Sequence, residues 1–108
     1  MQNVGHIGSI TIDEILLTAA GLLAGQVVQV TNLANGVLWR TYIIKGKKGK
    51  GEIVLNGPPA HHFHNGDIVI IWADAWVEVK DAKKMSPTVA FVNSKNKITK
   101  ITKGWRPS

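Results

Sequence analysis

The feature that most constrains this chain is a series of short apolar and β-branched runs separated by turn-forming residues. The runs have strand length and recur between Gly, Asn and Lys positions, a pattern typical of β-structure. A length of 108 residues suits one domain with one core. We therefore expect an all-β fold in a single domain over residues 1–108. The predicted strands cover residues 26–32, 37–45, 51–55, 67–72, 88–93 and 97–102.

Local signals connect these strands. Asn35-Gly36 predicts a tight primed turn, because both residue types tolerate positive φ. The glycine-lysine run at 45–51 predicts a second hairpin. One helix is expected to begin near Asp13 and to end at Gly21. The run at 67–72 is apolar at every position after its first, which predicts a strand through the middle of a closed barrel or sandwich.

Composition narrows the functional classes. The net charge of +6 favours an anionic partner. However, 11 of the 13 basic residues are lysines without interleaved aromatic or arginine residues, so we expect no nucleic-acid partner. No window reaches the roughly 18 apolar residues of a membrane span, and no signal peptide is recognisable, so a cytoplasmic location is expected. The absence of cysteine excludes disulfides and thiolate sites.

One constellation points to a particular chemistry. Gly8-Ser9 precedes Ile-Thr-Ile-Asp and the predicted helix, and it is followed in order by Thr41-Tyr42 and Asn56-Gly57. In this order and spacing the chain resembles the pyruvoyl-dependent aspartate 1-decarboxylases, from about residue 6 to about residue 98. The resemblance implies a double-psi β-barrel with one or two short helices. It also implies a homotetramer with active sites between neighbouring subunits.

The resemblance further implies a lyase that is made as a zymogen. The Ser9 hydroxyl would attack the Gly8 carbonyl in an autocatalytic cleavage, and Ser9 would become a pyruvoyl group. No diffusible cofactor and no metal would be needed, because a ketone beside an amide can form a Schiff base with the substrate amine and accept electrons. The expected reaction converts L-aspartate to β-alanine and CO₂ for pantothenate biosynthesis.

The same resemblance assigns roles to individual residues. Thr41 would hydrogen-bond the Gly8 carbonyl during cleavage, as an oxyanion donor does. Tyr42 would protonate the carbanion left after CO₂ departs. Asn56 would hold the pyruvoyl region, and Gly57 would allow close approach of the backbone.

The sequence departs from the family pattern around the substrate. The family's substrate-binding arginine falls on Leu38, and Arg40 lies two residues on, which is the same face of a strand. Arg40 is therefore the expected ligand of a dicarboxylic amino acid. The loop after Asn56-Gly57 contains Pro58 and Pro59, which lack the backbone N–H.

Two further expectations follow. The family's first strand, with its lysine and histidine, has no counterpart before Ser9, so we expect slow or incomplete self-cleavage. His61, His62 and His64 have no carboxylate at ligand spacing, so we expect no metal site. The alternative interpretation is a non-catalytic or substrate-altered double-psi barrel homologue that has lost part of the active site.

Overall fold

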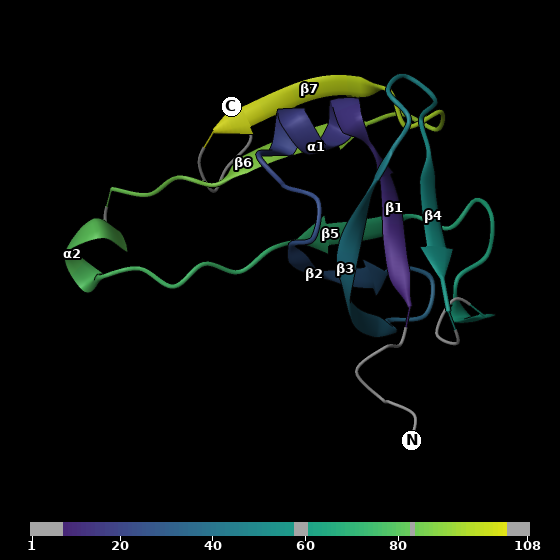
Figure 1. The fold of residues 1–108 in the computed structure, drawn as a ribbon, viewed down its shortest axis with the longest axis horizontal. Helices are drawn as coiled ribbons and strands as arrows, with labels where there is room; N and C mark the ends of the chain where they lie inside the picture. Colours follow the sequence, from purple (N-terminus) through teal and green to yellow (C-terminus); the bar gives the residue numbers. More distant parts are fainter. Residues whose placement is uncertain (1–7, 58–60, 83, 104–108) are drawn as a thin grey trace.

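The computed structural model describes residues 8–57, 61–82 and 84–103 (Figure 1). The predicted features at residues 1–7 and at Pro58 and Pro59 lie outside these ranges. The elements follow in the order β1 (Ser9–Asp13), α1 (Glu14–Ala20), β2 (Val27–Asn32), β3 (Leu38–Gly46), β4 (Ile53–Asn56), β5 (Val69–Trp72), α2 (Val79–Ala82), β6 (Thr88–Val92) and β7 (Ile98–Lys103).

Five strands form one curled sheet in the order β4-β1-β3-β2-β5. β1 runs parallel to β3 and antiparallel to β4, while β2 is antiparallel to both β3 and β5. β6 and β7 form a separate antiparallel pair beside α1 (Figure 1). The all-β prediction is confirmed, and the curled sheet with two short helices agrees with a double-psi β-barrel.

The core lies between β1, α1 and the middle strands. On β1, Ile10 and Ile12 alternate with polar residues, so both isoleucines point inward and are buried. The other buried members of this cluster are Leu16, Leu17, Val28, Val30 and Ile43. Burial of apolar surface at roughly 25 cal/mol per Å² makes this cluster the main source of stability for the sheet.

The helix begins and ends where the sequence predicts. Asp13 is the N-cap, and its Oδ1 accepts a hydrogen bond from the backbone N–H of Ile15 at 2.8 Å. Gly21 closes the helix in the left-handed conformation at φ 74°. The strand directly before it, β1, was not predicted, because five residues give too short an alternation to separate from the adjacent helical pattern.

Two predicted turns differ from the structure. The run at 45–51 does not form a hairpin, because β1 lies between β3 and β4 and pairs with both. The β2–β3 hairpin is confirmed, but its turn is longer than two residues: Gly36 N donates to Asn32 O at 2.8 Å, and only Gly36 has positive φ. Asn35 keeps an ordinary φ while its Oδ1 accepts from Val37 N at 2.9 Å.

The expectation for residues 67–72 was also wrong. β5 lies at an edge of the described sheet, and Ile68 and Ile70 are 68% and 52% exposed. An edge strand has a hydrogen-bonding partner on one side only, and within the described chain no second layer covers the side chains of Ile68 and Ile70. After β5 the segment that carries α2 extends away from the sheet (Figure 1), and Trp76 in it is almost fully exposed.

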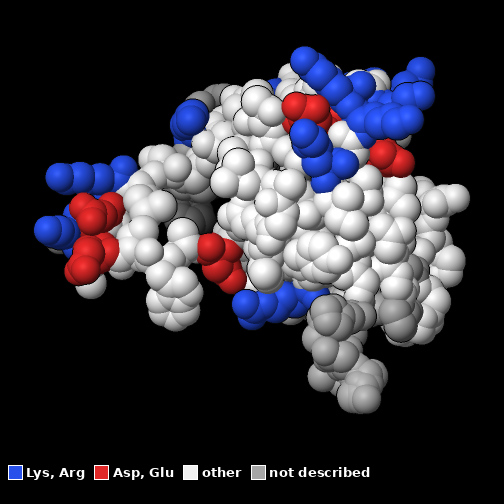
Figure 2. Space-filling view, in the orientation of Figure 1, with Lys and Arg blue, Asp and Glu red and all other residues white. Residues whose placement is uncertain are grey.

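Two lysine-containing segments, residues 45–51 and 95–103, meet in space. Lys97 Nζ donates to Gly49 O at 2.7 Å, and Asn96 Nδ2 donates to Gly51 O at 2.9 Å. These bonds join the β6–β7 turn to the loop between β3 and β4, and Figure 2 shows basic side chains gathered in this region. Within the described residues, neither helix is long and apolar enough to span a membrane.

Candidate active site at the Gly8-Ser9 bond

The start of β1 brings the predicted cleavage site between two neighbouring strands. Thr41 Oγ1, on β3, donates to Gly8 O at 3.1 Å. Asn56 Nδ2, at the end of β4, donates to Ser9 Oγ at 3.2 Å. Ser9 and Thr41 are 5% and 6% exposed. The sheet order therefore joins three predicted site residues that are distant in sequence.

Glycine is required at position 8 by both backbone and space. Gly8 has φ 102°, a region that L side chains rarely adopt. A Cβ placed there would overlap the Asn56 carbonyl oxygen and lie 3.0 Å from the Gly57 Cα. The two backbones thus approach closely, and Gly57 itself has φ 114°.

This geometry suits attack by Ser9 on the preceding peptide bond. Negative charge would develop on the Gly8 carbonyl oxygen, which already accepts the hydrogen bond from Thr41. The nucleophilic oxygen, Ser9 Oγ, is held by the amide of Asn56. A hydroxyl donor to the carbonyl oxygen and a hydrogen-bonded serine hydroxyl therefore flank one peptide bond, as an oxyanion donor and a nucleophile would.

Tyr42 and Arg40 lie on the other face of β3. Burial alternates along this strand, as a period of two requires. The inward side chains are Trp39, Thr41 and Ile43, and the outward ones are Leu38, Arg40, Tyr42 and Ile44. Arg40 does share a face with Leu38, as expected. Thr41 reaches the Gly8 backbone oxygen from the inward face, whereas Arg40 and Tyr42 lie on the outward face, which is also the face of Ser9 and Thr11 on the neighbouring strand β1.

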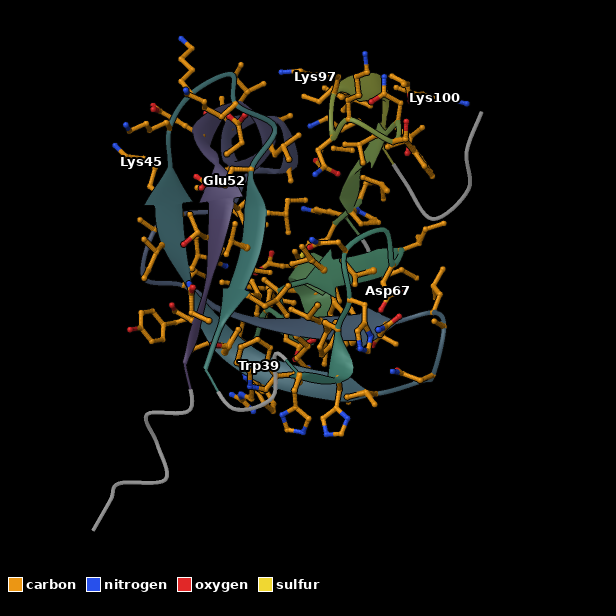
Figure 3. All side chains as sticks on the ribbon, turned by 90° about the vertical axis from the view of Figure 1, so that its right-hand side faces the viewer. Trp39, Lys45, Glu52, Asp67, Lys97 and Lys100 are labelled. Carbon is orange, nitrogen blue, oxygen red and sulfur yellow. The ribbon has the colours of Figure 1, made fainter. Side chains whose placement is uncertain are left out.

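Trp39 is an inward residue that was not singled out from the sequence. It is 4% exposed, and its ring packs against Phe63 with centroids 6.2 Å apart. Its buried Nε1 has no hydrogen-bond partner among the described residues. Figure 3 shows Trp39 at the end of the molecule where β1 begins and β4 ends. Strand alternation from Thr41 is the signal that could have identified it.

Asp13, at the end of β1 opposite to Ser9, forms a network of hydrogen bonds. Besides Ile15 N, its carboxylate accepts from Gly49 N at 3.1 Å and from Gly51 N at 2.6 Å. Burial by itself would raise the pKa of Asp13, but these backbone donors and the charge of Lys97 outweigh burial and lower the pKa below its ordinary value. The ionised carboxylate therefore ties β1 and α1 to the loop between β3 and β4.

A second polar network anchors the segment that follows the site. Asp67 Oδ2 accepts from His64 N and from Asn32 Nδ2, both at 2.8 Å. These two donors lower the pKa of Asp67. Asn32, which is fully buried, also donates to His62 O at 3.1 Å, and Asn35 donates to the same oxygen at 2.9 Å. The loop is held to the β2–β3 turn, and Figure 3 labels Asp67 there.

The histidines are placed by this loop. The ring centroids of His61 and His62 lie 4.1 Å apart, and both residues are exposed. Over residues 8–57, 61–82 and 84–103, no three His, Cys, Asp or Glu side chains are grouped so that they could hold a metal ion.

Comparisons with known proteins identify the family. The sequence model of the aspartate decarboxylase family matches residues 1–99. Aspartate 1-decarboxylase of Campylobacter curvus is 52% identical over 98 residues, which are 91% of this chain and 84% of that protein. The enzyme of Carboxydothermus hydrogenoformans is 50% identical over 99 residues, 92% of this chain and 78% of the relative. The enzyme of Flavobacterium psychrophilum is 45% identical over 98 residues, which are 91% of this chain and 84% of that protein.

These matches confirm the resemblance drawn from Gly8-Ser9, Thr41-Tyr42 and Asn56-Gly57. They also favour the enzyme over the non-catalytic alternative, because the relatives carry the name of an enzyme. With a family match over residues 1–99 and relatives about half identical to it, the chain belongs to the aspartate decarboxylase family.

Proposed function

We propose that this chain is an aspartate 1-decarboxylase that converts L-aspartate to β-alanine and CO₂ for pantothenate biosynthesis, after self-cleavage at Gly8-Ser9. The observation that carries the proposal is the pair of hydrogen bonds at this peptide bond. Thr41 Oγ1 reaches the Gly8 carbonyl oxygen at 3.1 Å, and Asn56 Nδ2 reaches Ser9 Oγ at 3.2 Å. Family membership supports the same reaction.

In the proposed cleavage, Ser9 Oγ forms a bond to the Gly8 carbonyl carbon while the Gly8–Ser9 C–N bond breaks. The hydroxyl proton passes to the released Ser9 nitrogen, which leaves an ester. Thr41 donates to the carbonyl oxygen as charge develops there. Loss of the Ser9 Cα proton then breaks the Cβ–Oγ bond and releases Gly8 as a carboxylate. Water then hydrolyses the resulting N-terminal dehydroalanine. Its nitrogen is released as ammonia, and a pyruvoyl group remains.

The donor set fits the formation of this prosthetic group, since the Thr41 hydroxyl and the Asn56 amide contact Gly8 O and Ser9 Oγ, the two oxygens that react in the cleavage and then leave as the Gly8 carboxylate. When present, a pyruvoyl group supplies a ketone that takes up the substrate amine and accepts the electron pair released with CO₂. Asn56 and Gly57 line its surroundings. No metal or diffusible cofactor enters the proposal.

The outward face of β3 supplies the remaining roles. We assign to the Tyr42 hydroxyl the return of a proton to the substrate Cα, and to Arg40 the binding of the second substrate carboxylate. Both side chains are exposed and face away from Thr41 in one chain. This is also the face on which Ser9 lies, because Ile10 and Ile43 pair on the inward side and Thr11 and Ile44 on the outward side. We further propose a cytoplasmic homotetramer whose active sites lie between neighbouring subunits.

The test uses the full chain with and without L-aspartate. After extended incubation, intact-mass measurement should show two fragments that separate at Gly8-Ser9 beside chain that is still uncut, and the C-terminal fragment should begin with a ketone that reacts with hydroxylamine. Amino-acid analysis should show β-alanine. Ser9→Ala should remain uncut and inactive. Absence of β-alanine from fully converted chains would contradict the proposed reaction, because the prosthetic group would then be present without turnover.

A further inference from the structure

We propose that Thr11 is a positioning residue for the self-cleavage, because it orients the Asn56 amide that holds the Ser9 nucleophile. This inference rests on the proposed function. It extends that function to a residue on β1 that does not contact the scissile bond.

The observation is that one amide nitrogen is shared by two hydroxyls. Asn56 Nδ2 donates to Ser9 Oγ at 3.2 Å and to Thr11 Oγ1 at 3.4 Å. An amide nitrogen carries two hydrogens, so both bonds can form at once. Ser9 and Thr11 are two residues apart on β1 and share a face, and Asn56 stands directly opposite Ser9 in the β1–β4 register.

The second bond matters because an asparagine side chain has two different ends. Oδ1 only accepts hydrogen bonds, and Nδ2 only donates them. Asn56 is exposed at the end of β4, so packing does little to fix its amide. A second acceptor at Thr11 favours the orientation in which Nδ2 faces both hydroxyls. A donor at Ser9 Oγ then stabilises the developing alkoxide and keeps the oxygen near the Gly8 carbonyl.

Packing fixes the direction of the Thr11 hydroxyl. Threonine is branched at Cβ, so placing its methyl group also places its hydroxyl. The Thr11 Cγ2 lies 3.1 Å from the position that a Cβ at Gly46 would occupy. Gly46 is buried, and it leaves room for the methyl on the β3 side of β1. The hydroxyl is consequently left to face β4 and Asn56.

The experiment compares Thr11→Val, Thr11→Ala and Thr11→Ser with the unaltered full chain. The rate of cleavage at Gly8-Ser9 is followed by intact mass from the time of purification. Loss of one neutral hydrogen bond should slow cleavage by about three- to tenfold in the valine and alanine variants. The serine variant keeps the hydroxyl and should cleave at close to the original rate. Thermal unfolding of each uncut variant checks that the fold is retained.

A double variant separates positioning from a general structural effect. In an Asn56→Ala background, the amide is already absent, so adding Thr11→Val should slow cleavage no further. Additive effects of the two changes would overturn the proposal. So would unchanged cleavage in Thr11→Val and Thr11→Ala, or an equal loss in Thr11→Ser.

The outcomes also distinguish this inference from the function beneath it. If the unaltered chain cleaves and makes β-alanine while all Thr11 variants cleave equally fast, only the role of Thr11 fails. If the unaltered chain never cleaves at Gly8-Ser9, the self-cleavage and the role of Thr11 fail together.

Discussion

Thr41 and Tyr42 are neighbours in sequence but lie on opposite faces of β3, and the proposed mechanism gives them two different roles. Thr41 is buried and reaches the Gly8 carbonyl, whereas Tyr42 is 42% exposed. Removing either hydroxyl should therefore give different defects. Loss of the Thr41 hydroxyl should slow formation of the prosthetic group, and loss of the Tyr42 hydroxyl should lower turnover by the group once it has formed.

Thr41→Val should slow self-cleavage at Gly8-Ser9 by roughly 10²–10³-fold, as removal of an oxyanion donor does elsewhere. Valine keeps the shape and the burial of threonine, so the fold should be retained. Time-resolved intact mass measures the rate, and Thr41→Ser, which keeps the hydroxyl, is the matched control. Cleavage of the valine variant at the original rate would remove Thr41 from the mechanism.

Tyr42→Phe should leave folding and self-cleavage largely intact while lowering turnover by roughly 10²–10⁴-fold, the range for loss of a general acid. The phenyl ring keeps the apolar surface of the tyrosine. β-Alanine production is measured on protein whose complete cleavage has been verified by mass. Undiminished production would exclude Tyr42 as the proton donor.

Arg40→Ala should mainly raise the KM for L-aspartate, because a carboxylate ligand stabilises substrate and transition state alike. Arg40→Lys is a partial control, since lysine keeps the charge but loses the bidentate geometry. Steady-state kinetics over a range of aspartate concentrations measure the effect. Unchanged KM in Arg40→Ala would mean that the guanidinium is only solvated.

At the scale of elements, β1 begins at the proposed cleavage site, Gly8-Ser9, and ends at Asp13. The pKa of Asp13 is lowered in the folded chain. A lowered folded-state pKa stabilises the fold above the unfolded pKa, and this stabilisation is lost as the pH falls through the folded pKa. Asp13 should therefore contribute fully at neutral pH and progressively less below about pH 4.

Asp13→Asn should lower the thermal unfolding midpoint at pH 7, and the gap from the unaltered chain should narrow as the pH falls from about 5 to about 2. Unfolding monitored by circular dichroism at several pH values measures the gap. Asp81→Asn in the exposed helix α2 is the control and should change little. A gap that stays constant over this pH range would contradict an ionised, hydrogen-bonded Asp13.

Local signals predicted most elements but could not predict which strands pair. The helix from Asp13 to Gly21 follows from a cap and a left-handed glycine, both of which act within a few residues. The run at 45–51 looks like a hairpin because its turn chemistry is local. The insertion of β1 between β3 and β4 depends on contacts across more than 30 residues, which turn propensity does not encode.

The candidate site was predictable only through the resemblance to a family. Gly8, Ser9, Thr41 and Asn56 are ordinary loop and strand residues when taken singly, and the sheet order brings them together. The part played by Thr11 could not be foreseen, since it depends on one side-chain amide that reaches two hydroxyls.

At the scale of the whole molecule, the proposed tetramer with sites between subunits raises the question of whether Tyr42 serves Ser9 of its own chain or that of a neighbour. In the proposed mechanism, chains with Ser9→Ala would form no prosthetic group, and chains with Tyr42→Phe would form it but lack the proton donor. If Tyr42 serves a neighbouring subunit, mixed assemblies contain sites with both intact parts. Coexpression in equal amounts should restore roughly a quarter of the original activity, as random pairing of two subunits at each site gives.

The controls are each variant expressed alone, which should be inactive or nearly so, and a mixture of the two purified variants that have not exchanged subunits. Activity of the coexpressed chains no higher than that of Tyr42→Phe alone would place Tyr42 in the site of its own chain.

A polypeptide that is cut normally gains two loose ends. Here the new end would be Ser9, the first residue of β1. This strand pairs with β4 from Ser9 onward and with β3 from Ile10 onward. Strand pairing would therefore hold the reactive terminus in place both before and after the cleavage. A prosthetic group made this way has no dissociation equilibrium and cannot be lost by dilution. The free energy that other enzymes obtain from binding a cofactor would come from folding alone.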